Sequence, residues 1–177
     1  MPYSTVAYTT YLKETLALLE DPGLLLVTAG SAGRANAMTI GWATIGVVWG
    51  KHVMTVLVRP SRHTYTLIEQ SDSFTVCVPR PDMHPAVEYC GQYSGRDGDK
   101  LAACNLTILP STRVRAPGID GCPVIYECRI VHKNDVNPAS LAKDITAYPT
   151  GNYHRLYYGE ILAVRAMPNA AEILSHA

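Results

Sequence analysis

The sequence has 177 residues, 47% hydrophobic and 17% charged, a composition typical of an ordinary globular domain. Its 15 basic and 15 acidic side chains cancel, which argues against a general nucleic-acid-binding protein, because such proteins are usually basic overall. No apolar run reaches the roughly 20 residues that span a bilayer, and the N-terminus lacks a basic leader followed by an apolar core. We therefore expect one domain over residues 1–177, with no nucleic-acid or membrane partner.

The first part of the chain predicts a helix followed by strands. Leucines repeat at helical spacing from Leu12 to Leu19, and Asp21-Pro22-Gly23 ends this helix. Segments rich in Leu, Ile, Val and Thr then predict three strands, over Leu24–Thr28, Met38–Val48 and Val53–Val58. Glycines predict one turn and two bulges, at Gly30–Gly33, Gly41 and Gly46.

The remainder of the chain alternates short helices with strands. Pro60 ends a strand, and Ser61 is a good N-cap for a helix over Thr64–Gln70. Further helices are predicted over Pro85–Tyr89, Asp97–Cys104 and Ala170–Leu174. Further strands are predicted over Phe74–Val78, Thr107–Val114, Pro123–His132 and Tyr157–Ala166. The strand Pro123–His132 alternates cleanly, with one face formed by Val124, Tyr126, Cys128 and Ile130.

This order of elements favours a mainly β fold with peripheral helices. Strands recur about every 10–20 residues, a spacing typical of an antiparallel barrel rather than a doubly wound parallel sheet. The sequence has neither a G-x-G-x-x-G after a strand nor a G-x-x-x-x-G-K-[ST]. A Rossmann or P-loop nucleotide site is therefore not indicated.

Cysteine usage indicates a reducing compartment. The number of cysteines is odd, no C-x-x-C pair occurs, and spacing typical of zinc sites is absent. We expect reduced, mostly buried thiols in a cytoplasmic protein, at Cys77, Cys90, Cys104, Cys122 and Cys128.

One long segment, Pro22–Ile68, contains basic residues and no Asp or Glu. Its cations are Arg34, Lys51, Arg59 and Arg62. Because the whole chain is neutral, the rest of it is net acidic. Cations beside hydroxyls and an indole suit an aromatic ligand that carries a phosphate.

The string Arg59–Thr64 within this segment predicts a phosphate site. A helix N-terminus carries partial positive charge and free N–H groups, so a phosphate there can accept from Arg59, Ser61 and Thr64. Arg62 either adds to this site or points to solvent. The alternative is that Ser61 only caps a helix and the arginines are surface residues.

The string Asn36–Trp42 predicts contacts to a flat ring. In a strand, Asn36, Met38 and Trp42 share one face and Thr39 lies on the other. Asn and Thr can hydrogen-bond a heterocycle or polyol, and Trp42 can cover a ring. The alternative is that Met38 and Trp42 belong to the core and Asn36 to a turn.

Two later strings carry polar side chains. Cys90–Lys100 is glycine-rich and includes Ser94, Arg96 and Lys100; Lys100 can neutralise an anion, and Arg96 can pair with Asp97 or Asp99. The alternative is a solvated loop. His154 is a candidate proton donor or else a packed histidine. No nucleophile, carboxylate pair or metal cluster stands out by spacing, as expected when a cofactor carries the chemistry.

Taken in order, five strings resemble the flavin reductase-like family, and within it its flavoredoxin-like members. They are N-A-M-T-I-G-W at Asn36–Trp42, V-R-P-S-R-H-T at Val58–Thr64, C-G-Q-Y-S-G-R-D-G-D-K at Cys90–Lys100, C-P-V-I-Y-E-C at Cys122–Cys128 and Y-H-R-L-Y-Y-G-E-I at Tyr153–Ile161. The likeness extends over roughly Leu24–Val164.

The resemblance implies a split β-barrel that binds FMN, as a homodimer with the flavin near the interface. It places the ring and ribityl chain against Asn36, Met38, Thr39 and Trp42, and the phosphate at Arg59, Ser61 and Thr64. It also places Ser94, Arg96 and Lys100 around the cofactor. In that family setting Lys100 would support negative charge on reduced flavin.

The function implied is that of an FMN-dependent oxidoreductase, a flavin reductase with NAD(P)H as donor. One alternative is a flavoredoxin-type electron-transfer protein that a redox partner protein reduces. Another is a non-catalytic flavin-binding module. The sequence has no nicotinamide fingerprint, so the choice between NADH and NADPH stays open.

Overall fold

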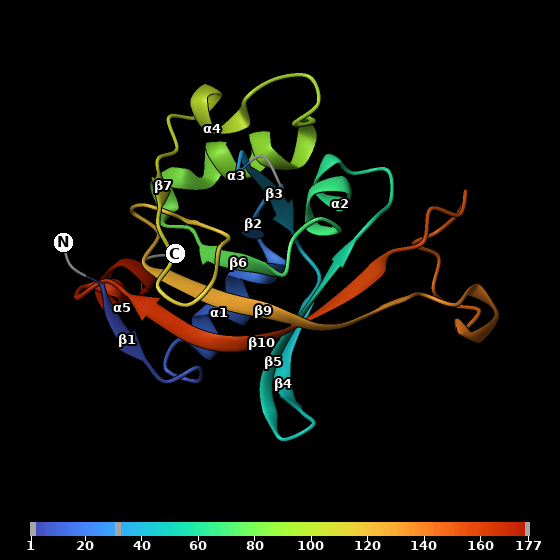
Figure 1. Cartoon of the computed structure of the whole chain (residues 1–177), viewed down its shortest axis with the longest axis horizontal. Helices are drawn as coiled ribbons and strands as arrows, with labels where there is room; N and C mark the ends of the chain where they lie inside the picture. Colours follow the sequence, from blue (N-terminus) through green and yellow to red (C-terminus); the bar gives the residue numbers. More distant parts are fainter. Residues whose placement is uncertain (1–2, 31–32, 176–177) are drawn as a thin grey trace.

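A computed structural model of the chain describes residues 3–30 and 33–175 (Figure 1). Its strands are β1 (Ser4–Val6), β2 (Leu24–Ala29), β3 (Ala35–Ile40), β4 (Ala43–Val48), β5 (Lys51–Val58), β6 (Ser73–Val78), β7 (Ile108–Leu109), β8 (Gly118–Ile119), β9 (Val124–Asp135) and β10 (Arg155–Ala166). Its α-helices are α1 (Leu12–Glu20), α2 (His63–Ile68), α3 (His84–Gln92), α4 (Lys100–Ala103) and α5 (Ala170–Leu174), and two 3₁₀ turns occupy Pro81–Met83 and Pro138–Ser140.

The main sheet is antiparallel and curls into a barrel. Its strand order is β3-β2-β6-β9-β10-β5-β4, with β1 added to β10, while β7 and β8 form a separate pair. The consecutive strands β3 and β4 stand at opposite ends of this order, although only Gly41 and Trp42 join them. The sheet must therefore bend until its two ends meet, without a hydrogen-bonded ladder between them. This confirms the expected mainly β fold and split barrel.

The predicted strand Met38–Val48 is wrong as a single element. Ile40 pairs with Leu24 of β2, whereas Ala43 pairs with Val56 of β5, so the backbone changes partner at Gly41 and Trp42. Gly41 lies in a connection rather than a bulge, and Gly46 sits in an unbroken register. The register shifts that the ladder does contain lie between β9 and β10.

The structure also differs from the predictions at several helix and strand ends and at the N-cap of α2. Ser61 does not cap α2: Arg62 is the N-cap residue, no side chain caps the helix, and the helix ends at Ile68. The predicted helix Asp97–Cys104 shrinks to α4, where Asp99 accepts from the N–H groups of Leu101 and Ala102. The predicted strand Thr107–Val114 shrinks to β7, and β1 and β8 were not predicted.

The loop after β7 is fixed by a buried carboxylate instead of by strand pairing. Glu127 of β9 is fully buried and accepts from the backbone N–H groups of Thr112 and Arg113, at 3.0 and 2.7 Å. Arg165 lies 3.4 Å from the same carboxylate. These long-range bonds satisfy backbone groups that a strand would otherwise have paired, and they end β7 early.

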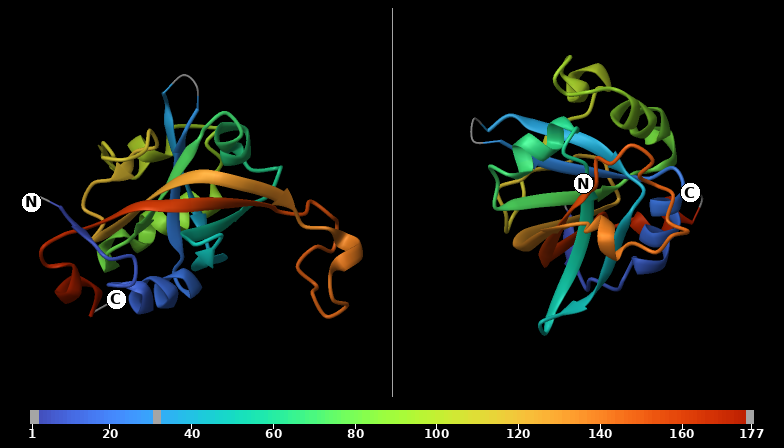
Figure 2. Two further views of the ribbon diagram at one scale, coloured as in Figure 1. Left: turned by 60° about the horizontal axis from the view of Figure 1, so that its bottom comes forward. Right: turned by 90° about the vertical axis from the view of Figure 1, so that its right-hand side faces the viewer.

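Both faces of β2 are buried, which places α3 against the barrel. Leu24 and Leu26 point into the barrel core, while Leu25 and Val27 pack under α3 with Val87. Burial of each such side chain contributes about 1.5–3 kcal/mol. As a result α3 lies along β2 and β3 on the outer face, and α2, α3 and α4 gather at one end of the barrel (Figures 1 and 2).

The described residues contain no helix long and apolar enough to cross a membrane. All five cysteines are free; Cys104 is partly buried and the others are buried. The expectation of mostly buried thiols is confirmed.

Gly159 provides a test of the barrel packing. A Cβ atom at Gly159 would meet Phe74 Cζ at 2.5 Å and Cys128 Cβ at 2.7 Å, whereas a Cβ at Gly46 would meet nothing within 4 Å. We expect Gly159→Ala to lower the free energy of unfolding by about 1–3 kcal/mol through overpacking. Gly46→Ala, the matched control in β4, should stay within about 0.5 kcal/mol in urea unfolding. Equal effects of both substitutions would contradict this packing.

Candidate functional site

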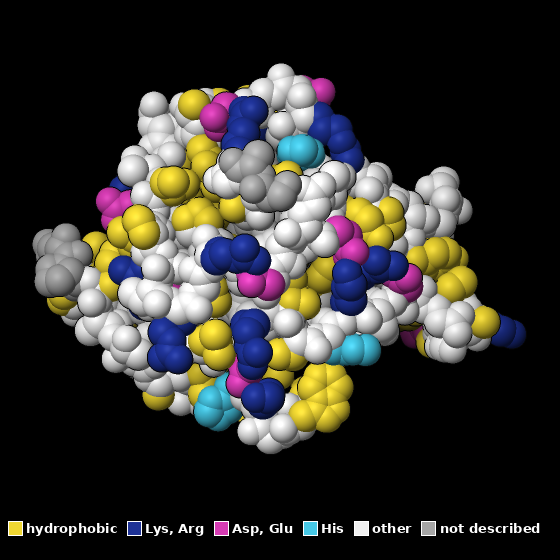
Figure 3. Space-filling view, in the orientation of Figure 1, with side chains coloured by type: hydrophobic (Ala, Val, Ile, Leu, Met, Phe, Trp, Pro, Cys, Tyr) yellow, Lys and Arg dark blue, Asp and Glu magenta, His cyan; other side chains and the backbone are white. Residues whose placement is uncertain are grey.

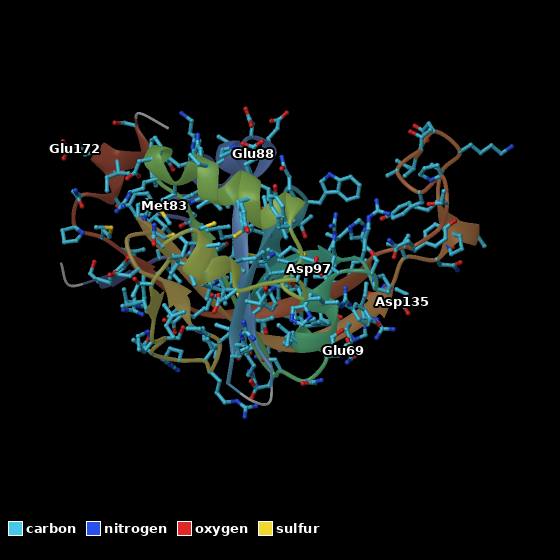
Figure 4. All side chains as sticks on the ribbon, turned by 90° about the horizontal axis from the view of Figure 1, so that it is seen from above. Glu69, Met83, Glu88, Asp97, Asp135 and Glu172 are labelled. Atoms are coloured by element: carbon cyan, nitrogen blue, oxygen red, sulfur yellow. The ribbon has the colours of Figure 1, made fainter. Side chains whose placement is uncertain are left out.

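Two adjoining hollows lie where β3, the end of β5 and the α3–α4 loop meet. The Trp42 hollow is lined by Met38, Thr39, Ile40, Gly41, Trp42, Leu57, Arg59, Arg62 and His154. The Lys100 hollow shares Met38 and Arg62 and is further lined by Ser61, His63, Thr64, Cys90, Gly91, Tyr93, Ser94, Gly95, Arg96 and Lys100. Figure 4 looks onto this end of the molecule, with Asp97 marking the α3–α4 loop beside α2.

Strand register explains why the residues of the Trp42 hollow meet. Ala43 pairs with Val56, so Trp42 falls beside Leu57 just before β4 begins. Arg155 pairs with Val58, so His154 falls beside Arg59 as β10 begins. The rings of Trp42 and His154 accordingly lie 5.1 Å apart. The expectation that Trp42 shares a strand face with Asn36 is wrong, because Trp42 belongs to the β3–β4 connection, where its side chain is half exposed.

The predicted residues of β3 have different surroundings. Met38 borders both hollows. Thr39 borders the Trp42 hollow, but its hydroxyl donates to the Val87 carbonyl oxygen and so links β3 to α3. Asn36 borders a smaller adjoining hollow, where its Nδ2 donates to Thr64 Oγ1 at 2.9 Å. Asn36 and Thr39 are thus fixed by hydrogen bonds, whereas the Met38 side chain is placed by packing alone.

The α3–α4 loop approaches β3 and α2 closely because residue 95 is glycine. A Cβ atom there would overlap Asn36 Oδ1 and lie 2.8 Å from the His63 ring. Arg96 then donates to the Ser61 carbonyl oxygen at 2.8 Å. The alternative pairing of Arg96 with Asp97 or Asp99 is not found; Arg34 lies 3.6 Å from Asp99 instead. The hydrogen bond from Arg96 therefore fixes the α3–α4 loop against the segment that follows β5.

Arg59 and Ser61 hold a second loop, between β9 and β10. Arg59 donates to the carbonyl oxygens of Asn152 and Ala147, at 3.2 and 3.0 Å, and its guanidinium lies over the Tyr148 ring. The Asn152 side chain donates to Ser61 Oγ at 2.8 Å. The predicted phosphate-binding residues Arg59 and Ser61 thus have protein partners already, a role that the sequence did not indicate.

Lys100 is a buried cation. Its side chain is 6% exposed, and its ammonium donates to the Cys90 carbonyl oxygen at 3.0 Å. Among the described residues it pairs with no carboxylate. Burial lowers its pKa, and Arg62 adds to this effect. A buried charge without a counter-ion is costly, so this position favours an anion from outside the chain.

The sheet surface contrasts with this arrangement. Figure 3 shows blue side chains beside magenta ones across the face that it presents. Among the ion pairs, Lys51 lies 2.7 Å from Glu160 and Arg115 lies 2.8 Å from Asp72. The cations of the sheet are thus neutralised within the chain, whereas Arg62 and Lys100 have no ion-pair partner among the described residues.

Burial and nearby cations lower the pKa of two histidines at the hollows. Burial, with Arg59 and Arg62, lowers the pKa of His154 to about 4. Burial, with Arg96, Lys100 and Arg34, lowers the pKa of His63. Both imidazoles are therefore neutral near pH 7, because a further positive charge is disfavoured there.

Sequence reasoning named most but not all of these residues. Every predicted site residue lies at one of the adjoining hollows. His63, Gly95, Tyr148 and Asn152 were not assigned a role. His63 and Gly95 lie within strings that were singled out, so their position was a usable signal. Tyr148 and Asn152 lie in a loop without a motif, and only the fold brings them to Arg59.

The flavin reductase-like domain profile matches residues 22–177. The chain belongs to the flavin reductase-like family. A protein of Archaeoglobus fulgidus is 30% identical to this chain over 131 residues. The matched region makes up 74% of this chain and 65% of the relative, so the chain spans less than two-thirds of the relative's length.

Solved structures of this family agree with the fold. Flavoredoxin of Desulfovibrio vulgaris (Miyazaki F) is 26% identical with a TM-score of 0.68, over 84% of this chain and 70% of that one. An FMN-binding domain of a flavin reductase-like enzyme from Shewanella baltica is 22% identical with a TM-score of 0.66, over 93% and 77%. The second likeness shows the fold alone. The resemblance to the flavin reductase-like family and its flavoredoxin-like members, inferred from the sequence, is confirmed.

The lowered pKa of His154 predicts a pH dependence of stability. In the unfolded chain a histidine titrates near 6.5, but in the fold His154 titrates at about 4. Between these values the unfolded state binds more protons, so the stability from the neutral imidazole is present above 6.5 and is lost as the pH falls towards 4. We expect His154→Gln to flatten this part of the curve in urea unfolding. A slope identical to that of the original protein would refute the assignment.

Proposed function

We propose that the chain is an FMN-dependent oxidoreductase, a flavin reductase that takes hydride from NAD(P)H. When bound, FMN supplies the hydride- and electron-accepting chemistry. The observation that carries the proposal is Lys100, a buried cation without a carboxylate partner among the described residues, beside the equally unpaired Arg62. An anionic cofactor supplies the missing counter-charge.

The Lys100 hollow fits the phosphate end of FMN. Arg62 and Lys100 contribute charge, and the hydroxyls of Ser61, Thr64 and Ser94 line the same hollow. Thr64 accepts from Asn36, which leaves its own hydrogen able to donate. The helix α2 has six residues, so its dipole is short and the side chains must provide most of the attraction. Arg59 acts mainly by holding the β9–β10 loop.

The Trp42 hollow fits the ring end. Met38, Trp42 and Leu57 offer apolar and aromatic surface, and His154 adds a neutral polar group. The residues of the hollow orient the ring and exclude water from it. Arg62 borders both hollows, and a cation at that boundary favours an electron-rich, negatively charged state of a bound ligand.

A second candidate function is flavoredoxin-type electron transfer, with a partner protein as the donor. The likeness to Desulfovibrio flavoredoxin favours it. Anaerobic stopped-flow mixing of the FMN-loaded protein with NADH or NADPH separates the two. Fast loss of the flavin absorption supports the reductase and identifies the donor. Loss only with a reduced partner protein supports the carrier, and loss with neither leaves a non-catalytic flavin-binding module.

We also propose a cytoplasmic homodimer. Free, mostly buried thiols support a reducing compartment. Val47 and Trp49, at the tip of the β4–β5 hairpin, are 62% and 63% exposed and offer apolar surface to a second copy. Light scattering coupled to size exclusion should give the mass of two chains, and Trp49→Glu should reduce it towards one. A monomeric original protein would contradict this assembly.

Substitution of Lys100 gives effects of opposite sign on binding and stability. We expect Lys100→Met to weaken FMN binding by at least about 1.4 kcal/mol, tenfold, because it removes the counter-charge of the ligand. The same change should raise the stability of the ligand-free protein by about 1 kcal/mol, since it removes a buried charge. Flavin fluorescence titration and urea unfolding measure the two quantities.

The control for this experiment is Lys13→Met, an exposed lysine of α1, which should leave both quantities unchanged. If the original protein binds no FMN at all, the proposed function fails. If it binds FMN but Lys100→Met binds it equally well, the phosphate end lies elsewhere.

A further inference from the structure

His154 is placed at the Trp42 hollow by three separate segments. It directly precedes β10, and its carbonyl oxygen accepts from Val136 N–H at 2.9 Å, which fixes its backbone. Its ring lies 5.1 Å from the Trp42 ring of the β3–β4 connection, and it meets Tyr148 of the β9–β10 loop edge-on at 5.6 Å. The side chain is only 9% exposed yet lines the hollow.

The hydrogen bond to Tyr148 couples the position of the imidazole proton to the direction in which the tyrosine O–H donates. Tyr148 Oη and His154 Nδ1 are 2.8 Å apart. When the tyrosine O–H donates to Nδ1, a neutral imidazole must carry its hydrogen on Nε2. Among the described residues Nε2 has no hydrogen-bond partner, and it is not among their buried unsatisfied atoms. In that tautomer, Nε2–H is a donor that faces the hollow and has no partner among the described residues.

Burial and nearby cations keep the ring neutral. Burial lowers the pKa of His154 most, and Arg59 and Arg62 add to this effect. Arg59 cannot swing away freely, because the carbonyl oxygens of Ala147 and Asn152 and the Tyr148 ring hold it. The group offered to a ligand is thus an uncharged donor of fixed direction.

We propose that His154 is a binding residue for the flat ring, donating from Nε2–H to an acceptor atom of the flavin, and that Tyr148 is the positioning residue that fixes this tautomer. The inference deepens the proposed function and rests on it. It assigns ring recognition to the β9–β10 loop and the start of β10, whereas the charged groups of the Lys100 hollow recognise the phosphate.

Riboflavin separates ring contacts from phosphate contacts, because it keeps the ring and polyol but lacks the phosphate. In fluorescence titrations we expect His154→Phe to weaken FMN and riboflavin by the same factor, about tenfold, the worth of one buried hydrogen bond. His154→Gln, whose amide can donate, should restore most of the loss. Lys100→Met, which changes the Lys100 hollow and not the lining of the Trp42 hollow, should weaken FMN and leave riboflavin unchanged.

The matched control is His52→Phe. His52 is exposed and stacks on Tyr8 at 3.9 Å, away from the hollow, so its replacement should change neither affinity. Circular dichroism and urea unfolding of each variant show whether it is folded. If His154→Phe does not fold, His154→Gln compared with His154→Met provides the same contrast of donor against non-donor.

Nitrogen NMR of the ligand-free protein tests Tyr148 without any cofactor. The histidine ¹⁵N shifts should show His154 with its hydrogen on Nε2, unchanged from about pH 5.5 to 8. Tyr148→Phe keeps the ring against Arg59 but removes the O–H, so both tautomers should appear in the spectrum. A purely structural Tyr148 would leave the tautomer unchanged.

The outcomes distinguish failure of the His154 proposal from failure of the proposed function. If the original protein binds neither FMN nor riboflavin, the proposed function has failed. If it binds both and His154→Phe binds them equally well, the inference alone is overturned. If His154→Phe changes only the KM of an electron donor or acceptor, then His154 contacts that second molecule and not the flavin, which also overturns it.

Discussion

The connection of β3 to β4 through Gly41 and Trp42 is the constraint on which the rest of the structure depends. It joins strands at opposite ends of the sheet, so the sheet can satisfy it only by closing on itself. Closure brings the carboxyl end of β3 beside the end of β5 and the start of β10. Met38, Arg59 and His154, which are far apart in the sequence, then line one hollow. The site is thus a direct product of barrel closure.

The closed barrel decides which basic side chains are paired within the chain and which are left to face the hollows. The acid-free segment Pro22–Ile68 contains four cations, but the fold treats them differently. Lys51 pairs with Glu160, and Arg34 lies beside Asp99. Arg59 is held by backbone carbonyls, and Arg62 alone among them faces both hollows without an ion-pair partner among the described residues. Lys100, from outside the segment, completes the positive site.

Local sequence patterns could predict the strands and the candidate residues, because β-branched and apolar runs, Pro and Gly act over a few residues. The helix α5 begins and ends where the sequence predicts. The same patterns could not find the break at Gly41, since Thr, Ile, Val and Trp continue through it as in one strand. Nor could they predict that Arg59 holds the loop containing Tyr148. That contact joins residues far apart in the sequence, since 88 positions separate Arg59 from Ala147.

The pairing of β10 with β1, β5 and β9 has a consequence for how the protein is made. Strand β10, Arg155–Ala166, pairs with three strands, including β1 at Ser4. During synthesis the edges of β5 and β9 remain open until this late strand leaves the ribosome, because nothing else in the sheet pairs with those edges. The barrel therefore closes only after β10 has been made, and until then two strand edges stay unpaired and open to wrong pairing.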